Sequence, residues 1–478
     1  MRRLSMIAIA AALAGAAAPA AAQHGTTPPS AGPLRPFRVP QPEEFTLSNG
    51  VRVVVVPVHA LPIVDGRILV RSGALYEPAA RAGLAQLTGN LLDQGVPGMT
   101  ASQITARMQR LGAQFSTSAN FATAWVDVTA LKDVFPEAIT LAARTVKEPT
   151  FPESEFTRIR TSMITGAVQR QSTVEGLSAE AFARAVFQPG SPYARVPAGS
   201  RATLETLTLN DVKEWHQRMY SPANTTLLLV GDLTAAEARR IAEQALGSWS
   251  APAVQVPTVA TPPRPVQDTR IILVDRPGSV QSGLWIGQAG MGYADPGYYP
   301  MVVLSQVLGG GLKARMNASL RERHGWTYAA FTNFNPRAQV GTFAVTTSVR
   351  TNATDSAVAE VVREYKRIAA EPVPAEELNL AKANIVGSFP NSVQTVQGLT
   401  GRIETLLAYG LPLSFWSTYR ERIAAVTSAD VARVGREKLT PNAITVIVAG
   451  DLSKIEQPIR ALNLGTVEVW DPLGNKVR

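Results

Sequence analysis

The sequence predicts an α+β protein made of two tandem homologous domains, each a largely antiparallel sheet with helices packed on it. Three observations lead to this fold class. Structural landmarks recur at a near-constant separation, runs of β-branched residues alternate with segments of helical periodicity, and a proline-rich stretch lies near the middle of the chain. We therefore expect the second half to repeat the architecture of the first.

The repeat is visible at several pairs of landmarks. In each half, a helix that ends near a proline precedes an apolar strand and a Gly-Asp-Leu triplet. The paired positions are Asp211 and Asp430 at the helix starts, Pro222 and Pro441, Gly231-Asp232-Leu233 and Gly450-Asp451-Leu452, and Glu77-Pro78 and Asp295-Pro296. Chance similarity of common strand patterns does not keep one separation over so many landmarks, so we infer duplicated domains.

Local patterns predict the elements within each half. Runs of β-branched residues indicate strands, and apolar residues at helical spacing between capping and stop residues indicate helices. In the first half, we expect strands over 51–57, 66–72 and 121–131, and helices over 80–94, over 101–111 between Thr100 and Gly112, after a capping Asp133, and over 151–170. In the second half, we expect helices over 300–308 and 312–324, with Gly325 as the stop, and a strand over 328–334.

Shifts in composition divide the chain into five segments. Residues 1–22 carry an arginine pair, an alanine-rich apolar stretch and a small-residue cleavage site, which predicts a secretory signal peptide and export to a bacterial periplasm. The alternative, a membrane anchor, is disfavoured because the stretch is alanine-rich and interrupted by Pro19. We expect a flexible lead over 23–45, domains over 46–250 and 268–465, and a proline-rich linker over 251–267.

The overall composition excludes several classes of protein. Hydrophobic residues make up 45% and charged residues 17% of the chain, which is typical of globular proteins. The lack of cysteine excludes disulfides, thiolate metal sites and a cysteine nucleophile. The net charge of +9 comes from scattered basic residues without the clustered stripe that nucleic-acid binding requires, so no nucleic-acid partner is expected. Attraction to acidic peptides or to an acidic partner is compatible with this charge.

One segment of the first half carries the strongest functional signal. Residues 73–95 read GALYEPAARAGLAQLTGNLLDQG. This segment resembles the active-site helix of the M16 (pitrilysin/insulinase) peptidases, whose H-x-x-E-H motif places two zinc-binding histidines and a glutamate on one helical face. Here the three positions hold Gln86, Gly89 and Asn90. Amides are poor zinc ligands and glycine has no side chain to polarise water, so the resemblance is to an M16 protein without its zinc site.

The resemblance also implies a third zinc ligand, a glutamate on a later helix, whose position falls at or near Gly166. No Asp or Glu occurs between Glu155 and Glu175, so this ligand is missing in any nearby register. The four histidines do not pair at the helical spacings that zinc sites use; they are His24, His59, His216 and His324. We therefore expect no metal and no cofactor in this chain.

The second half retains a pair of residues that M16 proteins place opposite the zinc. Arg321 lies in the last turn of the expected helix, and Tyr328 lies at the head of the following strand. The resemblance implies that both side chains hold the substrate backbone near the scissile bond, as donors to a peptide carbonyl and its developing oxyanion. The alternative is a structural role, in which Arg321 caps helix carbonyls and Tyr328 fills the core.

Together these features imply a non-catalytic, substrate-binding subunit of a heteromeric M16 zinc peptidase. This chain would supply Arg321 and Tyr328, and a catalytic M16 chain with H-x-x-E-H would supply the zinc. The alternative is a stand-alone periplasmic peptide-binding or assembly protein without peptidase activity. An enzyme of another class is disfavoured, because the chain has no G-x-S-x-G motif and few histidines.

Overall fold

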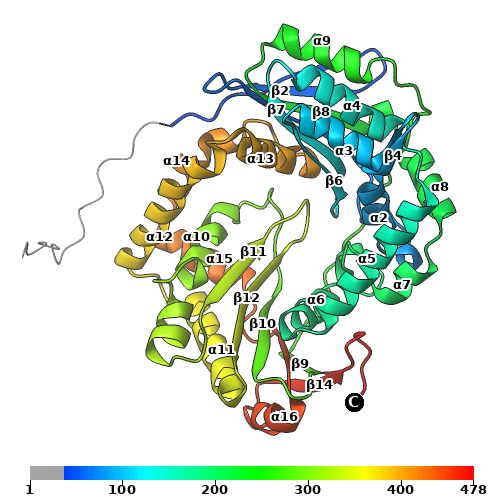
Figure 1. Cartoon of the computed structure of the whole chain (residues 1–478). Coiled ribbons are helices and arrows are strands. Elements are labelled where there is room, and N and C mark those ends of the chain that lie inside the picture. The colour runs from blue at the N-terminus through cyan, green and yellow to red at the C-terminus, as the bar shows by residue number, and fades with distance from the viewer. Residues whose placement is uncertain (1–36) are drawn as a thin grey trace, which may run out of the picture. The chain divides into compact units, whose positions relative to one another are not determined.

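Within residues 37–478, which the computed structural model describes, two six-stranded sheets form the framework of the protein (Figure 1). The N-terminal sheet has the order β1 (Glu43–Thr46), β2 (Arg52–Pro57), β8 (Thr225–Gly231), β3 (Ile63–Val70), β7 (Ala124–Leu131) and β6 (Gln114–Ala119). The C-terminal sheet has the order β14 (Thr466–Trp470), β9 (Arg270–Asp275), β13 (Thr445–Gly450), β10 (Gln281–Ala289), β12 (Thr342–Arg350) and β11 (Ala330–Asn335). The predicted signal peptide and the first part of the predicted lead lie outside the described residues.

The two sheets share one topology. Strands β2, β8, β3, β7 and β6 correspond in order to β9, β13, β10, β12 and β11; the first pair of each series is parallel and the other three are antiparallel. The sheets differ at one edge, where β1 runs antiparallel to β2 but β14 runs parallel to β9. The prediction of two homologous α+β domains with largely antiparallel sheets is confirmed.

The helices repeat in the same order. The N-terminal half contains α2 (Leu84–Leu91), α3 (Ala101–Arg110), α4 (Phe135–Lys147), α5 (Glu153–Gln171), α6 (Val174–Val186), α7 (Arg201–Thr206), α8 (Leu209–Met219) and α9 (Ala235–Leu246). The C-terminal half contains α10 (Tyr298–Gly309), a π-helical segment (Asn317–Arg323), α11 (Thr354–Ala370), α12 (Ala375–Ser388), α13 (Val396–Tyr409), α14 (Tyr419–Ala425), α15 (Ser428–Lys438) and α16 (Leu452–Ala461). A short ribbon, β4 (Gly95–Val96) with β5 (Met99–Thr100), follows α2.

Capping residues explain where the repeated helices begin. The helices expected from Asp211 and Asp430 start earlier, because Thr208 and Thr427 are the N-caps and each aspartate is the third helical residue of a capping box. Thr100 caps α3 through the same kind of box, as predicted. Asp133 does not cap α4, whose N-cap position is Val134 without a side-chain hydrogen bond.

Glycine and turn geometry explain where the predicted elements break. The helix expected over 80–94 is interrupted at Gly83, whose φ of +100° belongs to the left-handed region, and α2 begins directly after it. The strand expected over 121–131 begins at Ala124, because the side chain of Asn120 accepts hydrogen bonds from the backbone N–H groups of Ala122 and Thr123 and forms a turn. The strand expected over 66–72 is β3, shifted toward the N-terminus.

The predicted segment boundaries hold only in part. Strand β1 begins within the lead expected over 23–45 and ends at Thr46, and β14 continues the C-terminal domain beyond residue 465. The linker expected over 251–267 contains no helix or strand, apart from one bridge between Pro263 and Phe187. The helix expected over 312–324 begins at Arg315 and is largely π-helical, and Gly325 ends it with a φ of +62°, as predicted.

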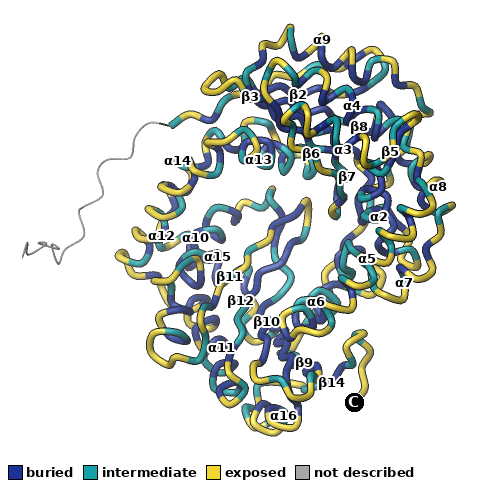
Figure 2. The backbone as a smooth tube through the Cα atoms, in the orientation of Figure 1, coloured by how far each residue is buried: buried dark blue, intermediate teal, exposed yellow. Residues whose placement is uncertain are grey.

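Each half contributes one helix to the sheet of the other half. Helix α6 packs against β10 and β13 of the C-terminal sheet, and α13 packs against β8 and β3 of the N-terminal sheet (Figure 1). Helices α4 and α9 pack on the N-terminal sheet and share its main apolar core. Figure 2 shows buried backbone in the strands and in the helices that cover them. Helices α6 and α13 thus join the two halves, because each packs on the sheet of the opposite half.

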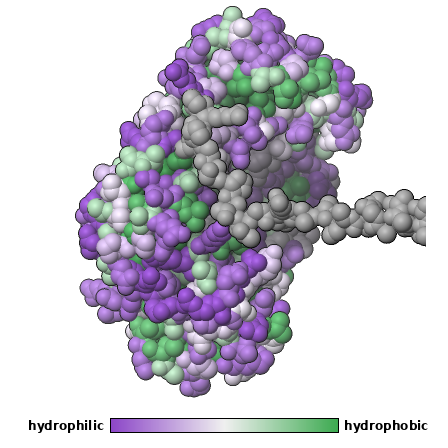
Figure 3. Space-filling view, turned by 90° about the vertical axis from the view of Figure 1, so that its left-hand side faces the viewer, coloured by the Kyte–Doolittle hydropathy of each residue, from purple (hydrophilic) through white to green (hydrophobic). Residues whose placement is uncertain are grey.

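The outer surface is mixed in character. On the face shown in Figure 3, hydrophobic side chains lie in several small groups among hydrophilic ones. Within residues 37–478, no helix is long and apolar enough to cross a membrane.

Candidate functional site

Helix α2, which carries Gln86, Gly89 and Asn90, is fixed at its start by a buried carboxylate. The Glu77 side chain accepts hydrogen bonds from the backbone N–H groups of Gly83 (3.0 Å) and Ala85 (2.9 Å). These donors are the orphan N–H groups of a helix start, which favour a negative charge. Burial nevertheless raises the pKa of Glu77 to about 7. Asp295, the paired landmark in the second half, likewise accepts from the N–H group of Gly297 before α10.

The position predicted for the general base, Gly89, is closed by backbone packing. Gly89 faces β6, and a Cβ atom on Gly89 would lie 2.6 Å from the carbonyl carbon of Ser118 and 2.8 Å from its oxygen. Contacts this short are not tolerated between a side chain and a backbone carbonyl, so no residue larger than glycine fits without displacing α2 or β6. The packing of the helix therefore excludes a glutamate at this position.

The two amide positions offer little to a metal. Asn90 is engaged, because its Oδ1 atom accepts a hydrogen bond from Ser118 Oγ at 2.9 Å and its Nδ2 atom lies 3.8 Å from Met163 Sδ. Gln86 is partly buried, and its Oε1 atom has no hydrogen-bond partner among residues 37–478. One amide oxygen without a neighbouring imidazole or carboxylate does not make a zinc site.

Helix α5 faces α2, as the position of a third ligand requires, but it presents no ligand. Met163 is the α5 residue that contacts Asn90. Gly166 is half-buried, and the nearest atom to a Cβ on it would be a guanidinium nitrogen of Arg170 at 3.9 Å. One turn beyond Met163, Ala167 is buried in the core. Met163, Gly166 and Ala167 offer no side chain that would bind zinc here.

The histidines lie in separate places. His216 Nε2 bonds the carbonyl of Val146 at 2.8 Å, and burial lowers the pKa of its imidazole. His59 Nδ1 lies 2.6 Å from Asp232 on the surface, and His324 stacks on Trp326. His24 lies outside the described residues. Among residues 37–478, no group of three or more His, Cys, Asp or Glu side chains could hold a metal ion.

The structure brings Arg321 and Tyr328 together. The guanidinium carbon of Arg321 lies 5.2 Å from the centre of the Tyr328 ring, and Arg321 Nε lies 3.2 Å from a carboxylate oxygen of Glu322. Tyr328 is 86% exposed, so the alternative in which it fills the core is wrong. A cavity of about 580 Å³ lies beside Tyr328 and is lined by Trp285 and Phe331, among other residues.

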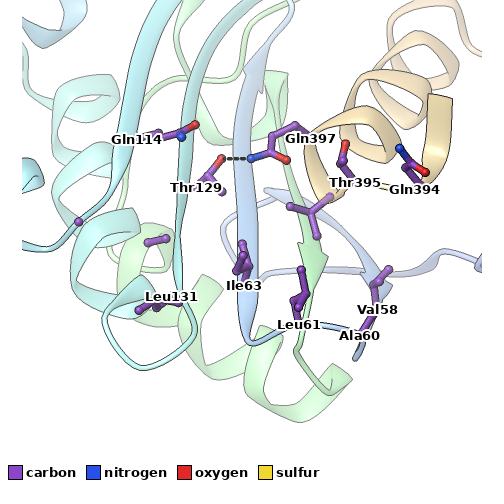
Figure 4. A pocket seen from close by; sticks show the side chains of 13 residues that line it. Val58, Ala60, Leu61, Ile63, Gln114, Thr129, Leu131, Gln394, Thr395 and Gln397 are labelled. Atoms are coloured by element: carbon purple, nitrogen blue, oxygen red, sulfur yellow. Dashed lines mark hydrogen bonds between the residues drawn. The ribbon is translucent and has the colours of Figure 1, made fainter. Parts of the chain in front are cut away.

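The cavity beside Tyr328 also borders the start of α6, and a second cavity borders the start of α13. This second cavity was not predicted from the sequence. A pocket of about 350 Å³ lies at the start of α13, next to the N-terminal sheet. One end is polar, where Gln397 donates a hydrogen bond to Thr129 at 3.3 Å, and the other end is apolar, with Leu61 and Leu131 (Figure 4). The repeated five-residue motif that begins α6 and α13, Thr-Val-Glu/Gln-Gly-Leu, was the available signal.

Comparison with known proteins identifies the family. The model of Insulinase (Peptidase family M16) matches residues 53–188, and the model of Peptidase M16 inactive domain matches residues 206–385. The chain is 21% identical over 409 residues to the non-peptidase homolog YmxG of Helicobacter pylori, covering 84% of this chain and 93% of that protein. It is 20% identical over 411 residues to the zinc protease PqqE of Helicobacter pylori, covering 84% and 90%.

Solved structures agree with this assignment. The fold is similar to that of a peptidase M16 inactive domain from Pseudomonas fluorescens, with a TM-score of 0.79 and 25% identity over 86% of this chain and 98% of that one. A protease from Helicobacter pylori superposes with a TM-score of 0.80 and 19% identity, covering 86% and 100%. The chain belongs to the M16 peptidase family, and its sequence contains no H-x-x-E-H motif.

Proposed function

We propose that this protein is a non-catalytic, substrate-binding subunit of a heteromeric M16 zinc peptidase. The observation that carries the proposal is the contrast between its two sites. The zinc position on α2 has no ligands and no room for a general base, whereas Arg321 is adjacent to Tyr328, with Arg321 partly exposed and Tyr328 86% exposed. A chain that keeps the contacts for substrate but lacks the chemistry suits a supporting role.

The exposed pair has the donors that a peptide backbone requires. The guanidinium of Arg321 presents several N–H groups in one plane, and its guanidinium carbon lies over the Tyr328 ring, 5.2 Å from the ring centre. The phenol of Tyr328 adds one further donor. The neighbouring cavity, lined by Trp285 and Phe331, offers an apolar space for a substrate side chain next to these donors.

The partner in this proposal is a catalytic M16 chain that carries H-x-x-E-H and the zinc ion. The family relatives support such a division, since one is named a non-peptidase homolog and another a zinc protease. We place the complex in the periplasm, on the basis of the signal peptide expected over residues 1–22. Zinc bound by the partner would supply the Lewis acid and the activated water.

The test begins with the tagged, full-length chain purified from a periplasmic extract. We expect a chain with H-x-x-E-H to co-purify, and the complex to cleave a fluorogenic peptide in a chelator-sensitive way. Arg321→Ala should lower kcat/KM of the complex by about tenfold or more, because it removes a charged donor to the substrate, without changing assembly. Tyr328→Phe should have a smaller effect through the loss of one hydroxyl.

The matched control is Arg323→Ala, which removes an exposed arginine from the same π-helical segment. It should leave both assembly and cleavage unchanged. Cleavage by the isolated chain in excess chelator would overturn the proposal, as would equal kcat/KM values for Arg321→Ala and Arg323→Ala. Peptide binding without any co-purifying peptidase would instead identify a stand-alone periplasmic peptide-binding or assembly protein.

A further inference from the structure

A cavity of about 440 Å³ lies where the N-terminal domain, the linker and the C-terminal domain meet. Arg71 and Tyr76 line it from the end of β3 and the loop that follows, and Thr258 lines it from the linker. Tyr409 lines it from the last residue of α13. The cavity thus depends on segments that are far apart in the sequence.

The polar side chains of this cavity are rich in unused hydrogen-bond donors. Within residues 37–478, the side chains of Arg71, Tyr76, Tyr193, Gln339 and Tyr409 make no hydrogen bond or ion pair with the protein, although all of them line the cavity. Burial raises the pKa of Tyr193 to about 12 and also raises the pKa of Tyr409, so both phenols stay protonated donors. An anion accepts hydrogen bonds from such donors, and no carboxylate of the lining competes for them.

The charged side chains that line the cavity are positive, which also favours an anion. No aspartate or glutamate lines the cavity, and its charged residues are Arg52 and Arg71. Arg52 pairs with Glu44 across β1 and β2, which leaves Arg71 as the uncompensated cation. Glu404, which accepts a hydrogen bond from the lining residue Thr123, is itself held by Arg67.

A second arginine, Arg337, does not line the cavity but contacts the lining residue Tyr193. Arg337 is only 8% exposed, and its Nη1 atom has no hydrogen-bond partner among residues 37–478. Its guanidinium carbon lies 3.8 Å from the centre of the Tyr193 ring and 4.5 Å from that of Phe121, so aromatic rings surround it in place of a carboxylate. A buried cation with only such partners adds positive potential to the neighbouring cavity.

From this arrangement we propose that the cavity binds a carboxylate of the peptide substrate, held by Arg71 with the hydroxyl groups of Tyr76, Tyr193 and Tyr409. The identification of the ligand as a peptide rests on the proposed function. The carboxylate comes either from the C-terminus of the peptide or from an acidic side chain. This site is separate from Arg321 and Tyr328, and it gives the protein a preference for anionic peptides.

The test measures binding of short fluorescein-labelled peptides to the isolated, full-length chain by fluorescence polarisation. Three peptides share one neutral sequence: the first ends in a free carboxylate, the second is amidated, and the third is amidated and carries one internal Glu. We expect the first, the third or both to bind about tenfold more tightly than the second, and Arg71→Ala to remove this difference. The peptide that responds identifies the source of the carboxylate.

Arg110→Ala, which removes an exposed arginine from α3, is the matched control and should leave the preference unchanged. Tyr409→Phe should reduce the preference less than Arg71→Ala does. Equal binding of all three peptides by the wild-type chain, or a preference that survives Arg71→Ala, would overturn this proposal and leave the proposed function intact. Lack of binding to every peptide would instead contradict the substrate-binding role itself.

Discussion

The two helices that cross between the halves pack on their sheets through opposite chemistry. Helix α6 covers the C-terminal sheet, and α13 covers the N-terminal sheet. Both begin with the same local structure, in which Thr173 accepts a hydrogen bond from the N–H group of Gly176, and Thr395 accepts one from that of Gly398. The duplicated backbone is therefore the same at the start, and the side chains that follow make the difference.

The packing of α6 is apolar and close. Phe182 is 1% exposed, and its ring centre lies 5.3 Å from that of Trp285 on β10. Gly283 lets the helix approach the sheet, since a Cβ atom there would lie 2.5 Å from the carbonyl oxygen of Val174. Phe182 and Val174 belong to an apolar core that α6 forms with the C-terminal sheet, and Trp285 packs against it.

The packing of α13 is polar at the corresponding positions. Strand pairing aligns Arg67 with Trp285 and Asp65 with Gly283, because β3 and β10 meet β8 and β13 in the same register. Arg67 forms ion pairs with Asp127 and with Glu404, which takes the place of Phe182 on α13. Asp65 is fully buried and accepts a hydrogen bond from the hydroxyl of Thr129.

The two halves therefore share the helix that packs on the opposite sheet, but the contacts are apolar for α6 and ionic for α13. Apolar burial stabilises the α6 contact at any pH. Buried charges cost desolvation and offset that cost only while every partner is present and ionised as required. The α13 contact should therefore depend on single residues and on pH in ways that the α6 contact does not.

The largest expected effect comes from the apolar contact. Phe182→Ala should lower the free energy of unfolding by about 4 kcal/mol, because it removes a fully buried ring and leaves a cavity against Trp285. Urea denaturation followed by circular dichroism measures this change. Val168→Ala on α5, where the side chain is 45% exposed, is the control and should change little. Similar losses for both variants would contradict the apolar account.

Breaking the ionic contact should cost slightly less. Arg67→Ala should lower the free energy of unfolding by about 3 kcal/mol, because it leaves Asp127 and Glu404 without their partner in a mostly buried place. A double variant with Glu404→Gln should lose less than the sum of the two single variants. The exposed pair of Arg52 and Glu44 provides the control, and Arg52→Ala should cost less than about 1 kcal/mol.

Asp65 should make the α13 contact sensitive to pH. Burial, with a further contribution from Asp127, raises the pKa of Asp65 from 3.8 to about 6. The unfolded chain releases this proton first as pH rises from about 4 to about 6, so this residue lowers the free energy of unfolding over that window. The free energy of unfolding of Asp65→Asn should rise by roughly 2 kcal/mol relative to that of the wild type between pH 4 and pH 7.

The pH dependence is measured by urea denaturation at both pH values. Asp133→Asn, which changes an exposed aspartate before α4, should show no such gain. A constant difference between Asp65→Asn and the wild type from pH 4 to pH 7 would show that folding does not raise the pKa of Asp65.

The smallest effect tests the part that the two helices share. Thr173→Ala and Thr395→Ala should each cost about 1 kcal/mol, because each removes the side-chain acceptor for an N–H group of the first helical turn. Thr173→Ser and Thr395→Ser keep the acceptor and should restore most of the stability. Thermal denaturation of the four variants makes the comparison, and very different losses at the two caps would show that the two helix starts are not equivalent.

Sequence patterns predicted much of the fold and part of the site. The paired landmarks predicted two homologous domains, and the family resemblance singled out Arg321 and Tyr328, whose side chains the structure brings together. The pairing of Arg67 with Glu404, 337 positions apart, could not be predicted, because one charged residue in a strand does not indicate its distant partner. The motif that begins α6 and α13 was present in the sequence and would have paired these helices.

The sequence by itself determined that this chain carries no M16 zinc motif, since residue identity alone decides whether a side chain can bind a metal. It also determined the duplication, because periodicity and spacing are properties of the chain. Only the tertiary structure decided that Gly89 lies against Ser118 with no room for a side chain, and that Arg71 and three tyrosines share one cavity. Such contacts join segments that are far apart along the chain, and their distances depend on how the sheets and helices pack.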